Sequence, residues 1–187
     1  MKYYELTYDY DLDDQVGFLR FDEELLPFKR YDVERRSRIS HNEVFCVVES
    51  ENVLEYDVWA NNMGWIIVNE KVKRVFEECK IGLTDFIVVK RSDTNVIVGY
   101  IVHCMNFVNA FDKIHSQYHS FIVNIAGEDI EKYIVYKFAI DSSRVGSLDL
   151  FKLDNHLFDV FATSKLKKRI EIECIRGLKF RLIKSNN

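Results

Sequence analysis

An α+β fold is predicted for this sequence, with a mostly antiparallel β-sheet and two pseudo-repeated strand-helix-strand units. Two observations predict it. Short segments alternate apolar and polar residues, as half-buried strands do, and one strand-helix-strand pattern occurs twice, over residues 65–90 and 159–184. The 187 residues are 48% hydrophobic and 14% aromatic, which is enough for a sizeable core and excludes a disordered chain.

The strands are predicted from their alternation and from the turn residues between them. The first is Tyr3–Leu12, where tyrosines and a leucine alternate with aspartates, so that one face is apolar and the other acidic. The polar residues 92–95 form a turn that makes Asp85–His103 a hairpin. The remaining predicted strands are Val44–Glu49, Trp65–Val68, His119–Ala126, Tyr133–Asp141, Leu148–Leu153 and Phe158–Thr163.

Both predicted helices lie inside the repeat. The first helix has one apolar stripe, at helical spacing, made of Val72, Val75, Phe76 and Cys79. Asn69 is its predicted N-cap, and the N-cap of the second helix is Ser164 or, alternatively, Thr163. Each copy then contains a Gly-Leu pair. We expect Gly82 and Gly177 to supply the left-handed residue after the last helical turn.

Charge is distributed unevenly along the chain. Met1–Glu24 contains eight acidic residues and two basic ones, whereas Lys165–Lys184 contains eight basic residues and two acidic ones. Two interpretations are open: the acidic end steers a basic partner, or the two ends lie together as neighbouring strands and neutralise each other. We expect residues 1–58 to form an acidic, β-rich segment of the same domain as the α+β region 59–187.

The composition also bounds the environment of the protein. With 26 Lys+Arg against 30 Asp+Glu, a dedicated nucleic-acid binder is not expected. The sequence has neither the ~18 apolar residues of a membrane-spanning helix nor the apolar region of a secretory signal. Its four cysteines are widely spaced and form no CxxC pair, which favours free thiols in a reducing compartment. We therefore expect a cytoplasmic protein that binds no membrane.

The possible metal ligands depart from known metal-binding patterns. Residues 9–13 open like a calcium loop, but Asp14 stands where glycine is required and Arg20 where the bidentate glutamate is required. His115 and His119 are four residues apart, yet the segment becomes strand-like, and a zinc pair at this spacing needs a helix. We expect no metal and no cofactor.

The sequence also lacks the known catalytic patterns. It contains no GxSxG, P-loop or GxGxxG motif. No catalytic residue is therefore predicted, and a binding protein is favoured over an enzyme. A hydrolase that uses an unrecognised carboxylate site remains the alternative, and a structural subunit of a larger assembly is a third possibility.

Partner-binding residues are predicted from the acidic segment and from an aromatic turn. Trp59 and Trp65 flank a polar turn; they are either core anchors or exposed anchors of an interface. The candidate partner-binding residues are Asp9, Asp11, Asp13, Asp14 and Trp59.

The order of motifs from Trp59 to Lys184 resembles a family of bacterial immunity proteins from polymorphic toxin systems, immunity protein family eleven. The segments that carry the resemblance are 66–71 (IIVNEK), 99–102 (GYIV), 107–112 (FVNAFD) with Ser116, 148–153 (LDLFKL), 160–167 (VFATSKLK) and 177–180 (GLKF). Asn69 stands where the family usually has serine, and both residues cap helices.

The resemblance implies a function as well as a fold. It implies an immunity-type α+β region at 59–187 and a protein that binds a cognate toxin in the cytoplasm and blocks it without turnover. The matching motifs carry no chemistry, and the toxin-facing residues of such proteins vary with the partner. The resemblance therefore assigns no functional residue.

Overall fold

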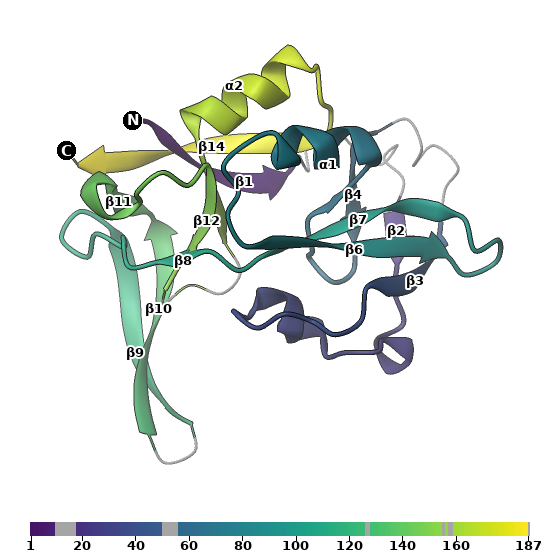
Figure 1. Cartoon of the computed structure of the whole chain (residues 1–187). Helices are drawn as coiled ribbons and strands as arrows, with labels where there is room; N and C mark the ends of the chain where they lie inside the picture. Colours follow the sequence, from purple (N-terminus) through teal and green to yellow (C-terminus); the bar gives the residue numbers. More distant parts are fainter. Residues whose placement is uncertain (10–17, 50–55, 126–127, 155, 157–158, 187) are drawn as a thin grey trace.

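Most of the chain is β-structure, and two short α-helices lie on one side of it (Figure 1). The structure is a computed structural model that describes residues 1–9, 18–49, 56–125, 128–154, 156 and 159–186. The described strands form a six-stranded sheet, a closed six-stranded barrel and a two-stranded hairpin that projects from the rest.

The six-stranded sheet has β1 near its middle. Its strands, in spatial order, are β11 (Ala139–Asp141), β14 (Leu178–Asn186), β1 (Tyr3–Tyr8), β13 (Val160–Thr163), β12 (Leu150–Leu153) and β8 (Phe107–Val108). Strand β1 is antiparallel to both neighbours, so that Tyr3 lies opposite Thr163 on one side and Ile183 on the other. The first strand of the chain therefore joins two strands that lie more than 150 residues away.

The barrel is formed by six consecutive neighbours that close into a ring. In spatial order they are β2 (Phe18–Arg20), β3 (Glu43–Val48), β6 (Thr84–Arg91), β7 (Ile97–Cys104), β5 (Ile67–Val68) and β4 (Val58–Asn61). Strands β6 and β7 form the hairpin that the turn at residues 92–95 predicted. Strand β2 closes the ring, because it pairs with both β3 and β4.

The pairing is more mixed than the sequence suggested. Among the described strands eight pairings are antiparallel and four are parallel. The parallel pairs are β11 with β14, β12 with β8, β2 with β4 and β3 with β6. Most of the described pairings are antiparallel, as predicted. Alternation within a strand is the same whichever way its neighbour runs, so the sequence did not show that both larger sheets are mixed and that one of them is closed.

The two strand-helix-strand units have the same strand arrangement. In one, α1 (Glu70–Glu77) connects β5 to β6, and β7 lies between these strands, antiparallel to both. In the other, α2 (Ser164–Ile172) connects β13 to β14, and β1 lies between them, antiparallel to both. The units belong to different sheets, and an internal duplication of the sequence stays a prediction.

The structure confirms Asn69 as the first N-cap and selects the alternative candidate for the second. The Asn69 side chain accepts a hydrogen bond from the Val72 amide at 3.0 Å. For α2 the alternative N-cap is the one used: the Thr163 hydroxyl accepts from the Leu166 amide, and Ser164 is the first helical residue.

The two predicted glycines do not directly follow the ends of the helices. Gly82 and Gly177 do have positive φ, +55° and +102°, but α1 ends at Glu77 and α2 at Ile172. Cys174, with φ +51°, is the residue that is left-handed directly after α2. The glycines instead allow close approach, since a Cβ at Gly177 would lie 2.8 Å from a backbone oxygen of Val58.

Three apolar cores hold the elements together. One core fills the barrel, a second lies between the barrel, the sheet and both helices, and a third lies on the other face of the sheet. Leu6 of β1, Phe76 of α1 and Leu166 of α2 meet in the second core. A buried ion pair between Glu34 and Lys152 adds a polar link between the chain before β3 and the sheet.

Short 3₁₀ helices and the projecting hairpin complete the fold. The 3₁₀ helices are η2 (Glu23–Leu25), η3 (Arg30–Glu34) and η5 (Ser142–Arg144), and the hairpin consists of β9 (Gln117–Ile125) and β10 (Glu128–Lys137). The predicted strand Tyr133–Asp141 therefore spans the end of β10, the buried Phe138 and the separate strand β11.

Candidate functional site

Strand β3 presents apolar side chains on both faces. Val44 and Cys46 point into the barrel core and are almost fully buried. Phe45 and Val47, on the opposite face, remain 48% and 45% exposed. Strand β6 pairs with Glu43–Cys46 on one side of β3, and β2 pairs with Val47 and Val48 on the other, so both exposed residues belong to hydrogen-bonded parts of the strand.

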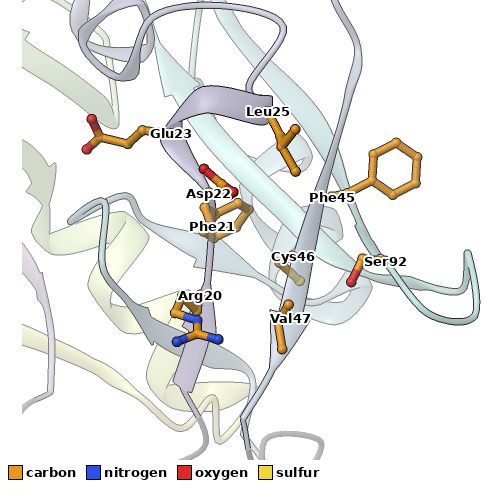
Figure 2. Close-up of a pocket in the computed structure, with 9 residues that line it drawn as sticks. All are labelled: Arg20, Phe21, Asp22, Glu23, Leu25, Phe45, Cys46, Val47 and Ser92. Carbon is orange, nitrogen blue, oxygen red and sulfur yellow. The ribbon is translucent and has the colours of Figure 1, made fainter.

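An open groove of about 630 Å³ runs along this outer face (Figure 2). Strand β3 forms one wall, and the segment from β2 into η2 forms the other. Leu25 on η2 is 80% exposed and lies across from Phe45 in Figure 2. The groove is lined by Arg20, Phe21, Asp22, Glu23, Leu25, Phe45, Cys46, Val47 and Ser92. We call the exposed trio Leu25, Phe45 and Val47 the β3 face.

Charged residues surround the apolar centre in pairs. Arg20 lies 3.3 Å from Glu49, Glu23 lies 3.5 Å from Arg30, and the Lys90 ammonium lies 2.5 Å from the Glu43 carboxylate. Ion pairs this exposed add little to stability. An apolar centre with a polar rim is the arrangement found at protein interfaces.

The side chains around the groove are suited to binding a partner and not to catalysing a reaction. Burial raises the pKa of the Cys46 thiol to about 11, so that the sulfur stays a neutral thiol, and the thiolate is the reactive form. The Asp22 carboxylate accepts a hydrogen bond from the Glu24 amide at 3.0 Å and thereby caps η2. These groups do not converge on a point where a substrate would react.

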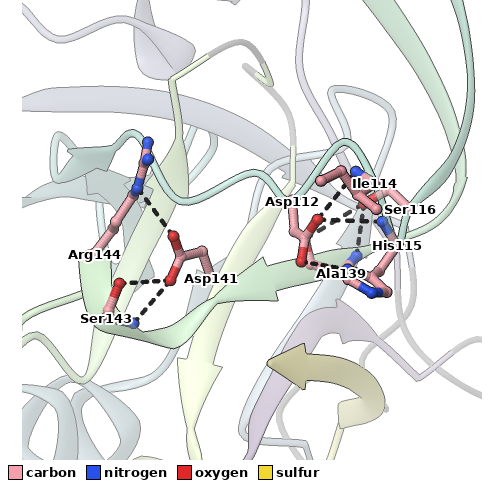
Figure 3. A network of polar contacts seen from close by, with 8 residues as sticks. All are labelled: Asp112, Ile114, His115, Ser116, Ala139, Asp141, Ser143 and Arg144. Atoms are coloured by element: carbon pink, nitrogen blue, oxygen red, sulfur yellow. Dashed lines mark hydrogen bonds and ion pairs between the residues drawn. The ribbon is translucent and has the colours of Figure 1, made fainter. Parts of the chain in front are cut away.

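The two histidines that were considered as a metal pair lie in and after the turn before β9. His115 lies in the turn before β9, where its Nδ1 is 2.9 Å from Asp112 Oδ2 (Figure 3). The other oxygen of Asp112 accepts from the amides of Ile114 and His115, so this carboxylate holds the turn. His119 follows on β9. Within the part of the chain that the structure describes, no group of three or more His, Cys, Asp or Glu side chains is arranged to hold a metal.

The base of the hairpin is fixed by a polar network (Figure 3). Ser116 exchanges hydrogen bonds with the backbone of Ala139, at 2.9 Å and 3.4 Å. The Asp141 carboxylate accepts from Ser143 and forms an ion pair with Arg144 at 3.0 Å. The Ser116 contacts join the turn before β9 to β11, and the Asp141 contacts cap the neighbouring η5.

The acidic end of the chain lies beside the basic end. Strands β1 and β14 are antiparallel neighbours. The Glu5 carboxylate accepts from the Arg181 guanidinium at 2.9 Å, and Asp9 lies 3.9 Å from the Lys179 ammonium. For Glu5 and Asp9 the structure therefore favours neutralisation over an acidic face that steers a partner.

The other acidic candidates cannot be placed in this way. Asp11, Asp13 and Asp14, and with them most of the calcium-like pattern at residues 9–13, lie outside the described residues. Their assignment to a partner-binding surface stays a prediction.

Trp59 lies in the barrel core and not at the surface. It is 2% exposed, and a Cβ on Gly99 would lie only 2.2 Å from its ring carbon Cζ3. Trp65 is 4% exposed, and its Nε1 donates to the Arg30 carbonyl at 3.2 Å. The exposed-anchor interpretation of Trp59 is therefore corrected to the core interpretation, because Gly99 leaves the space in which the ring packs.

Sequence reasoning missed Phe45 and Val47, although a signal was present. The predicted strand Val44–Glu49 is apolar at five successive positions, 44–48. A strand with one solvated face normally alternates. An unbroken apolar run indicates that both faces are covered, or that one face is an exposed apolar surface.

One of the comparisons with known proteins identifies a family. A family model described as "Immunity protein family (Imm11)" matches residues 7–185. No curated protein matches the chain. The described helices include none with the length and apolarity that crossing a membrane requires. The match extends over nearly the whole chain, and the chain therefore belongs to the Imm11 family of immunity proteins.

Proposed function

We propose that this protein binds a cognate bacterial toxin in the cytoplasm and neutralises it without catalysis, through the β3 face. The observation that carries the proposal is the exposure of Leu25, Phe45 and Val47 around one groove. Monomeric proteins rarely leave large apolar side chains together at the surface unless that surface binds something. Membership of an immunity protein family supports a toxin as the partner.

The chemistry of the β3 face suits a protein partner of ordinary size. An interface of ~800 Å² on each partner has an apolar centre and a polar rim. Phe45 supplies an aromatic side chain at the centre, and aromatic residues are over-represented among interface hot spots. When a toxin buries Phe45 in the interface, the immunity protein covers part of the toxin surface. Inhibition by such occlusion needs no reacting group on the immunity protein.

The charge near the groove suits a basic toxin. Asp22, Glu23 and Glu24 are exposed on and beside η2, and they follow the acidic residues Asp11, Asp13 and Asp14 in the sequence. We infer that this acidic segment accelerates the encounter with a positively charged partner. Reversing Asp11, Asp13 and Asp14 to lysine lowers the association rate constant, as does added salt, and stopped-flow measurements with the purified toxin check this. A rate that neither change lowers contradicts a basic partner.

The proposal is tested with the product of the neighbouring reading frame. Phe45→Glu is expected to weaken its capture by about thirtyfold or more, since a hot-spot side chain contributes ~2 kcal/mol or more to binding. Rescue of growth in cells that express the toxin is expected to fall in parallel. Ile172→Glu is the matched control, because Ile172 is also apolar and 58% exposed but lies at the end of α2.

Folding must be checked in both variants by circular dichroism and thermal unfolding. If folded Phe45→Glu protein still binds the toxin and rescues growth like the parent, the β3 face is not the toxin-binding surface. If the parent protein itself neither retains that partner nor rescues growth, the assignment to toxin neutralisation fails.

A further inference from the structure

Strand β14 has an open edge. On one side its residues Leu178–Ile183 pair with β1. On the other side β11 pairs only with Lys184–Asn186. Among the strands that the structure describes, none covers the rest of this second side. Alternate backbone N–H and C=O groups of a strand point to each side, so an uncovered edge offers hydrogen bonds to an added strand.

A groove of about 550 Å³ lies beside this edge. Arg181, Leu182 and Lys184 of β14 line it together with Tyr136 and Lys137 from the end of β10. Leu182 is 60% and Tyr136 is 65% exposed. The groove is therefore continuous with the open edge, and it offers apolar side chains to whatever lies along β14.

The side chains that line the groove carry a net positive charge, which favours an acidic partner. Three bases, Lys137, Arg181 and Lys184, line it against one acid, Glu5, which leaves two net positive charges. The Glu5 carboxylate already binds the Arg181 guanidinium at 2.9 Å, and 60% of the Arg181 side chain remains exposed. A segment with acidic side chains complements this lining.

A second copy of this chain does not fit the same edge well. Pairing β14 with itself across a two-fold axis places the bases Lys179, Arg181 and Lys184 of one copy near those of the other. Like charges opposite each other on neighbouring strands are destabilising. The charge of the edge therefore favours a different, acidic chain over a homodimer.

We infer that the open edge of β14 is a docking site for an extended, acidic segment of a partner protein, which adds to the sheet as a further strand. Such strand addition draws affinity from backbone hydrogen bonds and selectivity from alternate side chains. Neighbouring positions of β14 alternate between Arg181 and Leu182, so the added strand alternates acidic and apolar residues. The inference concerns a second surface and is independent of the β3 face.

The probe for this site is an acetylated and amidated hexapeptide of alternating glutamate and valine with a fluorescent label. It is titrated against the full chain by fluorescence anisotropy, and binding is expected to weaken as salt rises. In Lys137→Glu/Lys184→Glu protein, the dissociation constant is expected to rise about tenfold or more. Lys168→Glu, on the exposed side of α2, is the charge-matched control and is expected to bind like the parent.

A second peptide separates strand addition from simple charge attraction. The same peptide N-methylated at alternate residues keeps its charge but loses backbone donors, and we expect its binding to be lost. In amide NMR spectra, the parent peptide is expected to shift the signals of residues 178–184. A folded Phe45→Glu variant is expected to bind the peptide like the parent. The experiment therefore distinguishes a failure of the β14 docking site from a failure of the β3 face as the toxin-binding surface.

Four results would overturn the inference. They are absence of binding, equal binding by a lysine-valine peptide, equal binding by the N-methylated peptide, and shifts confined to residues outside β14. Sedimentation of the free protein as a dimer, with the β14 amides protected, would show that a second copy occupies the edge instead.

Discussion

His103 shows how one buried side chain couples folding to pH. It is fully buried, and its Nε2 donates to the Arg35 carbonyl at 3.1 Å, while Nδ1 has no hydrogen-bond partner among the described residues. Burial lowers the pKa of His103 below its ordinary value of 6.5, and the nearby Lys152 ammonium also lowers it. The Arg35 carbonyl and the Asp85 carboxylate act in the opposite direction without reversing the shift.

The lowered pKa makes stability depend on pH. When the pH falls through 6.5, this histidine becomes protonated in unfolded chains but stays neutral in the folded protein. The stabilisation is therefore complete above pH 6.5 and is lost as the pH falls towards the pKa of the folded state. We expect urea unfolding to show a smaller free energy at pH 5.5 than at pH 8, and His103→Asn to reduce that difference. His41→Asn, at an exposed position, is expected to leave the difference between the two pH values unchanged. If the parent protein and both variants show the same difference in unfolding free energy, the role of His103 is contradicted.

At this scale the sequence predicted some positions and missed others for a physical reason. The Asn69 cap depends only on residues three apart along the chain, so local pattern was sufficient. The burial of Trp59 depends on Gly99, forty residues later, and the exposure of Phe45 depends on which face of β3 closes the barrel. Neither fact is present in the local pattern.

At the scale of elements, the start of α2 depends on Thr163. Its hydroxyl accepts from the Leu166 amide and donates to the Asp149 carboxylate at 2.8 Å. Burial alone would raise the pKa of Asp149, but hydrogen bonds from Thr163 and the Lys80 amide, together with the Lys165 ammonium, hold this pKa below its ordinary value. The cap therefore joins α2 to the strand β13, to the segment before β12 and to the chain after α1.

Thr163→Ala is expected to lower the free energy of unfolding by about 1–2 kcal/mol, because it removes an N-cap and a partner of a buried carboxylate. Ser164→Ala is the control, since Ser164 is helical and does not cap α2; its effect is expected to be within about 0.5 kcal/mol. Urea unfolding at pH 7, followed by circular dichroism, measures both. Equal losses in the two variants would show that the Thr163 cap does not limit the stability of α2.

The elements were predicted better than their arrangement. Both helices and the β6–β7 hairpin are local structures, and alternation with turn residues located them. Strand direction and barrel closure depend on contacts between distant segments, such as β2 with β4 and β3 with β6. The prediction of a strand at Trp65–Val68 found β5, whereas β8, of two residues, was not predicted because it is too brief to show a period of its own.

At the scale of the whole molecule, the first 58 residues contribute strands to both the six-stranded sheet and the barrel. Strand β1 lies between β13 and β14, and β2 and β3 complete the barrel that β4–β7 begin. Leu6 of β1 and Leu19 of β2 are buried in two different cores. Residues 1–58 and 59–187 thus share their hydrogen-bonded ladders as well as their apolar contacts, and we propose that they fold as one unit.

This proposal predicts the behaviour of the fragment 59–187. Without β1, strands β13 and β14 lose the neighbour that connects them, and without β2 and β3 the barrel is open, so unpaired strand edges and apolar surface are exposed together. We expect the fragment to show no cooperative urea transition, whereas the full chain shows one. Fluorescence of Trp59 and Trp65, both buried in the barrel, reports the difference directly. Adding a peptide of residues 1–58 is expected to restore the native emission, and a fragment that unfolds cooperatively by itself would contradict a single folding unit.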